Sequence, residues 1–89
     1  MISYIKGQAV AVTTGRIIIE TGGVGYAVNI YNSSVSKIGD VYEFFIHEHI
    51  REDCDDLYGF KSFEELELFE KLISVNGVGP KAGLNITKV

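Results

Sequence analysis

The sequence predicts an α+β fold, in which a small five-stranded β-barrel is followed by a helix-hairpin-helix segment. Up to about residue 60 the apolar residues are mainly β-branched or aromatic and come in short runs separated by turn residues, which is typical of strands. After residue 60 the apolar residues recur at helical spacing, and a glycine-rich segment follows. We therefore expect residues 1–61 to form a barrel domain and residues 62–89 to form a helix-hairpin-helix motif.

The first three strands are predicted over residues 2–12, 16–21 and 26–30. Gly7 interrupts the first of them, and we expect a β-bulge or a tight bend there. Turn residues separate the strands at 13–15 (Thr-Thr-Gly) and at 22–25 (Gly-Gly-Val-Gly). In the third strand, apolar residues alternate with Ala27 and Asn29, as expected of a strand with one face inward.

Two further strands follow the polar stretch 32–40. Residues 41–50 place Tyr42, Phe44 and Ile46 on one face, and residues 57–60 form a short fifth strand after a charged loop, 51–56. Five short strands in about 60 residues suggest a closed barrel, for which the OB fold is the commonest solution. Periodicity alone leaves an SH3-like barrel open.

A helix of about 13 residues is predicted from Ser62 to the neighbourhood of Val75. Ser62 and Glu65 match a capping box at its start. Apolar residues follow at helical spacing, namely Phe63, Leu66, Phe69, Leu72 and Ile73. Residues 76–79 then read as a tight hairpin, and Pro80 suits the first position of a second helix, where its missing N–H has no helical partner.

The glycine hairpin is the most informative motif in the chain. At Gly77, Val78 and Gly79 the backbone N–H groups can approach a ligand closely, and Lys81 adds a positive charge at the start of the next helix, which is chemistry suited to a phosphate. The dinucleotide-binding fingerprint is rejected because a helix, not a strand, precedes the glycines. The Walker pattern also fails. A purely structural interhelical turn remains the alternative.

The charge distribution confines any phosphate site to the end of the chain. The net charge of -4 opposes binding to DNA, because phosphate neutralisation by Lys and Arg dominates such affinity. Residues 76–89, however, contain Lys81 and Lys88 and no acidic residue.

Composition places the protein in a reducing compartment. Cys54 is the single cysteine, so no intrachain disulfide is possible, and no apolar run of 18 or more residues suggests a membrane span or a leader. We therefore expect a cytoplasmic protein without a membrane partner. A chain this short buries only about 60% of its unfolded surface and often depends on a partner subunit.

The loop 51–56 holds four carboxylates, Glu52, Asp53, Asp55 and Asp56. A calcium loop counted from Asp53 would need glycine where Tyr58 stands, so the residues alone favour a solvated turn.

Histidines and tyrosines are candidate ligand-binding groups. His47 and His49 lie on the same side of a predicted strand and supply half of a zinc site, which is too few ligands, so we expect no metal. Four tyrosines could stack on bases, but filling the barrel or a subunit interface is the favoured interpretation for Tyr4, Tyr26, Tyr42 and Tyr58.

Six landmarks taken together resemble the RuvA family, in order and at similar spacing. They are the opening Met-Ile, residues 22–26 (Gly-Gly-Val-Gly-Tyr), 51–53 (Arg-Glu-Asp), 57–60 (Leu-Tyr-Gly-Phe), 68–69 (Leu-Phe) and 76–81 (Asn-Gly-Val-Gly-Pro-Lys). The resemblance implies an OB-like barrel that builds a homotetramer, followed by a helical domain with two helix-hairpin-helix motifs that grip the arms of a four-way DNA junction. It implies that Gly77, Val78, Gly79 and Lys81 bind DNA phosphates, independently of sequence.

The resemblance also assigns Glu52 and Asp53 as acidic pins at the junction centre, where their charge repels the phosphate backbone. It implies a RuvB-type motor ATPase and the junction resolvase RuvC as partners, and no cofactor. The family chain is about twice as long, so residues 62–89 would be the first motif of an incomplete helical domain. Gly83, Asn85 and Thr87 are weak helix formers, and we expect this tail to be frayed.

Two other classes of function were considered. An assembly module, a barrel that only oligomerises or docks a protein, is the main alternative to junction binding. An enzyme has little support, since the sequence shows no Ser/His/Asp arrangement, no activated-cysteine motif and no complete metal set, and we expect no catalytic residues.

Overall fold

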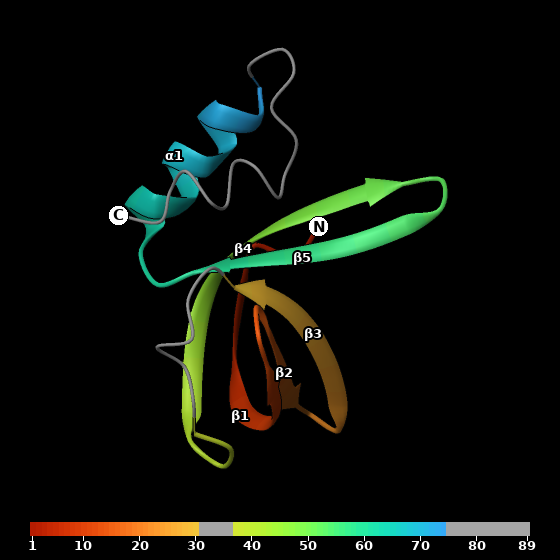
Figure 1. Cartoon of the computed structure of the whole chain (residues 1–89), viewed down its shortest axis with the longest axis vertical. Coiled ribbons are helices and arrows are strands. Elements are labelled where there is room, and N and C mark those ends of the chain that lie inside the picture. Colours follow the sequence, from red (N-terminus) through yellow and green to blue (C-terminus); the bar gives the residue numbers. More distant parts are fainter. Residues whose placement is uncertain (31–36, 75–89) are drawn as a thin grey trace.

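The computed structural model describes residues 1–30 and 37–74 and shows a β-barrel with one helix beside it (Figure 1). Its elements in chain order are β1 (Tyr4–Thr13), β2 (Arg16–Thr21), β3 (Val24–Ile30), β4 (Val41–Arg51), β5 (Cys54–Phe60) and α1 (Phe63–Ile73). The strands form a closed barrel in the order β1-β2-β3-β5-β4.

The strand pairing decides between the two barrel types that periodicity left open. β1 lies between β2 and β4 and is antiparallel to both, whereas β3 and β5 run parallel where they close the barrel. This order is that of the five-stranded OB fold, so the predicted barrel is confirmed. The second helix of the predicted helix-hairpin-helix motif would lie in residues 75–89, outside the described residues.

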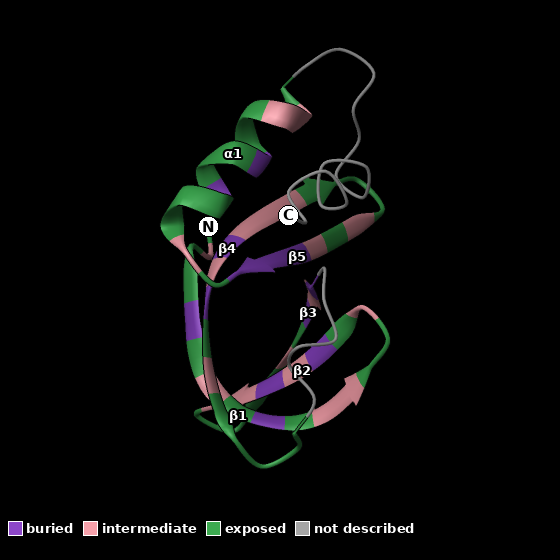
Figure 2. Cartoon of the chain, turned by 60° about the vertical axis from the view of Figure 1, so that its left-hand side comes forward, coloured by how far each residue is buried: buried purple, intermediate pink, exposed green. Residues whose placement is uncertain are grey.

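Alternating apolar residues fill the barrel, as the period of two predicted. Ile17, Ile19 and Val28 are completely buried, while their neighbours in the same strands are half-buried or exposed. Figure 2 shows the buried positions as separate bands along β1 to β4. The whole barrel core consists of Ile5, Ala9, Ile17, Ile19, Val28, Ile30, Phe44, Ile46 and Leu57.

The irregularity predicted at Gly7 lies two residues further along. The register between β1 and β2 shifts between Ala9 and Ala11, whereas Gly7 keeps its place in the ladder opposite Tyr42 of β4. A Cβ atom on Gly7 would lie 2.2 Å from the carbonyl oxygen of Glu20. Glycine is therefore required there by the close approach of β2, and the bulge prediction for Gly7 was wrong.

The predicted charged loop 51–56 is wrong as well, because most of it is strand. β4 continues to Arg51 and β5 begins at Cys54, which leaves Glu52 and Asp53 as a two-residue turn. Toward the tip of this hairpin Ile50, Arg51 and Asp55 are exposed, so polarity need not alternate there, and acidic residues that are rare in half-buried strands are accommodated. We call residues 47–58 the arm; it projects away from the barrel in Figure 1.

Helix α1 begins as predicted, at the cap formed by Ser62. The backbone N–H of Glu65 donates to Ser62 Oγ over 3.2 Å. The helix has 11 residues and ends at Ile73, which is shorter than the predicted length of about 13. Leu66 and Phe69 form its buried face, whereas Phe63, predicted to belong to that face, is 55% exposed. No helix in residues 1–30 and 37–74 is long and apolar enough to cross a bilayer.

Candidate nucleic-acid interface

The two faces of the arm differ in what covers them. Strand register places His47, His49 and Arg51 of β4 opposite Tyr58, Asp56 and Cys54 of β5 on the face toward α1. The opposite face carries Glu48 and Ile50 of β4, with Leu57 and Asp55 across from them. Only the part of the first face nearest the barrel is covered by the helix.

Phe69 fixes α1 to the base of the arm. Its ring is fully buried and lies 4.8 Å from the ring of Phe60, 5.5 Å from that of Tyr58 and 5.3 Å from that of His47, measured between ring centroids. His47 Nδ1 is also 2.9 Å from Glu70 Oε2, which ties the next residue of α1 to β4. The helix is therefore held to the arm by an aromatic cluster and one polar contact.

The tip of the arm presents negative charge to solvent. Glu52 and Asp53 occupy the turn and are both exposed. The guanidinium of Arg51 is turned along its own strand, where Nε donates to His49 Nε2 over 2.7 Å. Residues 47–58 contain five carboxylates and Arg51 as their one Lys or Arg residue, so the arm as a whole is acidic.

The single cysteine does not provide a nucleophile here. Burial of the Cys54 thiol, together with the carboxylates of Asp56 and Asp53, raises its pKa above the ordinary value. The thiol is therefore protonated at neutral pH, which is the unreactive form. In the part of the chain that the structure describes, no group of three or more His, Cys, Asp or Glu side chains could hold a metal ion, so His47 and His49 remain an incomplete pair.

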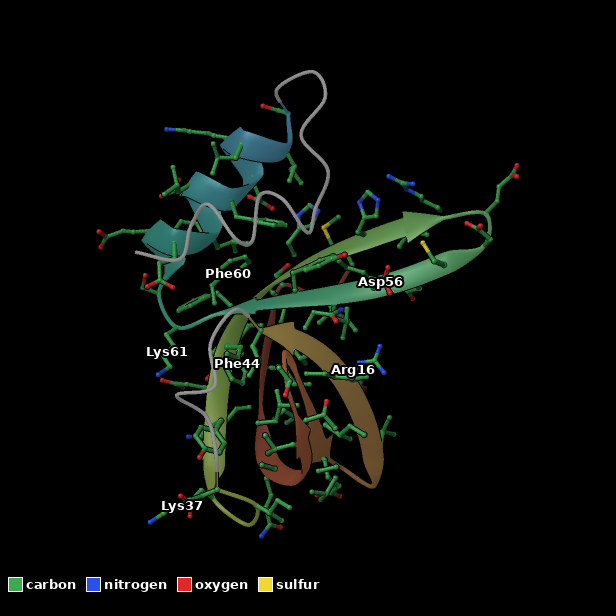
Figure 3. The ribbon with its side chains drawn as sticks, in the orientation of Figure 1. Arg16, Lys37, Phe44, Asp56, Phe60 and Lys61 are labelled. Atoms are coloured by element: carbon green, nitrogen blue, oxygen red, sulfur yellow. The ribbon has the colours of Figure 1, made fainter. Side chains whose placement is uncertain are left out.

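Basic residues of the barrel are scattered. Arg16, Lys37 and Lys61 are exposed, and Figure 3 shows Arg16 on the opposite side of the barrel from Lys37 and Lys61. The exposed surface of α1 carries Glu64, Glu65 and Glu67. Residues 1–30 and 37–74 hold all twelve acidic residues but six of the eight Lys and Arg residues. This part of the molecule thus repels a phosphate backbone more than it attracts one.

The predicted phosphate-binding residues Gly77, Val78, Gly79 and Lys81 lie outside the described residues. The structure therefore brings together the two predicted acidic residues, at one turn, and does not bear on the glycine hairpin.

Of the four tyrosines named from the sequence, two pack against the barrel core, as favoured there, and a third is buried between α1 and the arm. Tyr58 is 3% exposed within the aromatic cluster, and Tyr26 and Tyr42 pack against the barrel core. Tyr4 is 47% exposed, and its hydroxyl donates to Glu43 Oε2 over 2.6 Å. Sequence reasoning missed the contact between His47 and Glu70, since nothing in the spacing of residues 23 positions apart marks it.

The chain was compared with known proteins. Residues 1–59 match the family model described as the RuvA N terminal domain. The chain belongs to the RuvA family. A relative from Halothermothrix orenii, named Holliday junction branch migration complex subunit RuvA, is 47% identical over 87 residues, which are 97% of this chain and 45% of that protein.

Two more relatives with the same name are similar to this chain over nearly its whole length. One from Clostridium botulinum is 40% identical over 92 residues, covering all of this chain and 46% of its own length. One from Bacillus velezensis is 43% identical over 86 residues, covering 97% of this chain and 43% of its own length. The chain thus spans somewhat less than half the length of these RuvA proteins.

Proposed function

We propose that this chain is the DNA-structure-recognition part of a branch-migration complex subunit, which binds four-way junction DNA independently of sequence and contributes no catalytic residue or cofactor. One observation carries the proposal: two exposed carboxylates, Glu52 and Asp53, stand on a tight turn at the far end of an arm that projects from the barrel. The names of the relatives support it, since each is called a Holliday junction branch migration complex subunit.

Glu52 and Asp53 would act by repulsion. A carboxylate about 4 Å from a phosphate in a water-like environment raises the energy by about 1 kcal/mol, and by more where water is excluded. At a crossover, where two strands exchange partners, such repulsion favours strands that part on either side of the tip. No bond forms or breaks, so the residues are acidic pins in an electrostatic sense only.

Attraction to DNA would come from another part of the chain. We assign it to the backbone amides of Gly77, Val78 and Gly79 and to the charge of Lys81. The acidic surface of the barrel, arm and helix supports this division. Phosphate neutralisation needs clustered cations, whereas Arg16, Lys37 and Lys61 are scattered. A Gly79→Val variant should lose junction affinity while the thermal unfolding of the barrel stays unchanged.

Assembly with other subunits belongs to the same proposal. A homotetramer in the cytoplasm would bring four tips to one junction, with a RuvB-type motor ATPase supplying force and the resolvase RuvC as a further partner. Apolar side chains exposed on the barrel, including Val10, Val24 and Val41, offer surface for subunit contacts.

The test is a gel-shift titration of a synthetic four-way junction against a linear duplex of matched length, at one fixed low salt concentration. This chain and the full-length Halothermothrix orenii relative are titrated side by side. Preference for the junction by both supports the proposal for residues 1–89. Preference by the relative alone supports the second candidate, an assembly module, which the acidic surface of the described residues favours. Preference by neither contradicts junction recognition, and cleavage of the junction on addition of magnesium would indicate a nuclease.

A further inference from the structure

Residues 1–3 run along β4 at the base of the arm. The last regular pair between β1 and β4 joins Tyr4 to Phe45, but two hydrogen bonds continue beyond it. The backbone N–H of Ile46 donates to the carbonyl oxygen of Ser3 over 2.8 Å, and the backbone N–H of Ile2 donates to Glu48 Oε1 over 2.8 Å. The N-terminus accordingly lies against the arm in Figures 1 and 2.

Glu48 also lies next to a carboxyl group on β5. Register places Glu48 opposite Leu57 and Asp55 opposite Ile50, so Glu48 and Asp55 are diagonal neighbours on the face away from α1. The hydrogen bond from the Ile2 amide, followed by that with Asp55, lowers the pKa of Glu48. The same hydrogen bond to Glu48 is the main cause that raises the pKa of Asp55. The Ile2 amide thus favours the charged form of Glu48, the form that accepts the stronger hydrogen bond.

The arm needs support at this point. A two-stranded hairpin on its own is marginally stable in water. One face of the arm is held at its base by α1, through Phe69 and the contact between His47 and Glu70. On the other face, the Glu48 carboxylate is the outermost group that joins the β1 side of the barrel to β4 by a hydrogen bond in the described residues.

We propose that Glu48 is a positioning residue, which ties residues 1–3 to the base of the arm and so fixes the direction in which Glu52 and Asp53 point. The tie itself follows from the geometry. Its consequence for DNA rests on the proposed function of the tip.

The test compares two substitutions at one position. In chains that keep Met1, Ile2→Pro and Ile2→Ala both lose the half-buried side chain, but only proline also removes the N–H that donates to Glu48. Glu48→Ala removes the acceptor, and Glu48→Gln keeps an uncharged one. The first readout is hydrogen exchange at the Ile46 amide, which bonds to Ser3. The second is the mobility of the Glu52 and Asp53 backbone amides at the tip, measured by the ¹⁵N heteronuclear Overhauser effect.

We expect Ile46 to exchange about tenfold faster in Ile2→Pro than in Ile2→Ala, because one hydrogen bond to a charged group changes an opening equilibrium by about that factor. Glu48→Ala should give a similar increase in exchange and more mobile amides at Glu52 and Asp53, and Glu48→Gln should give smaller changes. Equal exchange in the two Ile2 variants, or an unchanged rate in Glu48→Ala, would overturn the proposal. If Ile2→Pro fails to fold, the comparison of Glu48→Ala with Glu48→Gln decides.

The same variants separate this inference from the proposed function. Fluorescence of 2-aminopurine at the crossover of a four-way junction reports the opening of its central base pairs. Glu52→Gln with Asp53→Asn should alter that signal and leave Ile46 exchange unchanged, whereas Glu48→Ala should alter both. An unchanged signal in the tip variant, together with faster exchange in Glu48→Ala, would contradict the pin function and support the tie.

Discussion

The two halves of the β4–β5 hairpin share one ladder but have opposite chemistry. Within the barrel, Phe44 and Ile46 of β4 and Gly59 and Phe60 of β5 are buried. In the arm, carboxylates stand on the exposed tip and on both faces of the hairpin. The difference indicates that the inner half specifies the fold, whereas the outer half can vary in polarity without cost to the core.

The outer half is ordered by its neighbours and not by a core of its own. Cross-strand pairing from Arg51 and Cys54 inward joins the backbone groups that the two strands of the arm turn toward each other. Helix α1 holds one face at the base, and residues 1–3 hold the other. Substitutions can therefore test whether stability lies in the inner half and at the base, and whether the tip is free to serve DNA.

The largest expected effect is that of Phe69→Ala. Phe69 is fully buried between α1 and the base of the arm, and removing its ring leaves a cavity among Tyr58, Phe60 and Leu66. A Phe→Ala change of this kind costs about 3–5 kcal/mol. Chemical denaturation should therefore show a sharp loss of the free energy of unfolding.

Leu68→Ala is the matched control for Phe69→Ala, because Leu68 precedes it in the same helix and is 47% exposed. Its cost should stay below about 1 kcal/mol. Equal losses in the two variants would mean that α1 does not pack on the arm as described.

A second prediction concerns Gly59, where the arm leaves the barrel. A Cβ atom there would lie 2.6 Å from Val28 Cγ1 and 3.2 Å from Phe44 Cγ, at the closure between β3 and β5. Gly59→Ala should cost about 1–3 kcal/mol through overpacking. Gly25→Ala, whose Cβ would meet Ile18 Cγ2 at 3.3 Å, is the milder control in a thermal unfolding series. The closure assignment fails if the two variants unfold at the same temperature.

Much of this fold could be predicted because burial leaves a period in the sequence. The alternation around Val28 and Ile30 and the helical spacing of Leu66 and Phe69 follow directly from one-sided burial, and the structure confirms them. The cap at Ser62 was visible because its chemistry is local.

The arm could not be predicted in the same way. Its strands carry Asp55 and Asp56, which rarely occur in strands, and exposure near the tip removes the alternation that marks a strand. The bulge near Ala9 and the tie between Ile2 and Glu48 depend on contacts between distant segments. Glu52 and Asp53 were singled out by a family resemblance, and their place at the tip became apparent only in three dimensions.

The contact between His47 and Glu70 should make a smaller contribution than Phe69. Their side chains are 16% and 48% exposed, so solvent screens the interaction. A double-mutant cycle with His47→Gln and Glu70→Gln should give a coupling energy of about 0.2–1 kcal/mol that declines at high salt. A coupling that is zero at low salt would show that the aromatic cluster alone holds the helix.

In contrast to Phe69→Ala and Gly59→Ala, Asp55→Asn should stabilise the protein slightly at neutral pH. The pKa of Asp55 is raised in the folded protein, mainly by its hydrogen bond to Glu48. The proton on Asp55 therefore stabilises the folded protein fully only when the pH is below 3.8, the ordinary pKa of this group. This stabilisation is lost as the pH rises through the raised pKa that Asp55 has in the folded protein. An asparagine amide donates to Glu48 at any pH, so Asp55→Asn should unfold at a slightly higher temperature at pH 7 and match the parent below pH 3.8. A deficit at pH 7 would contradict this role of the proton on Asp55.

The smallest expected effect on stability belongs to the tip, and it completes the comparison. Glu52 and Asp53 are exposed, so Glu52→Gln with Asp53→Asn should change the free energy of unfolding by no more than about 0.5 kcal/mol. The same variant should bind a four-way junction more tightly, by a margin that shrinks as salt rises, because two repelling charges are gone. A loss of stability would contradict the assignment of the tip as an exposed turn. Tighter binding with unchanged stability would support the role of these carboxylates in repelling DNA.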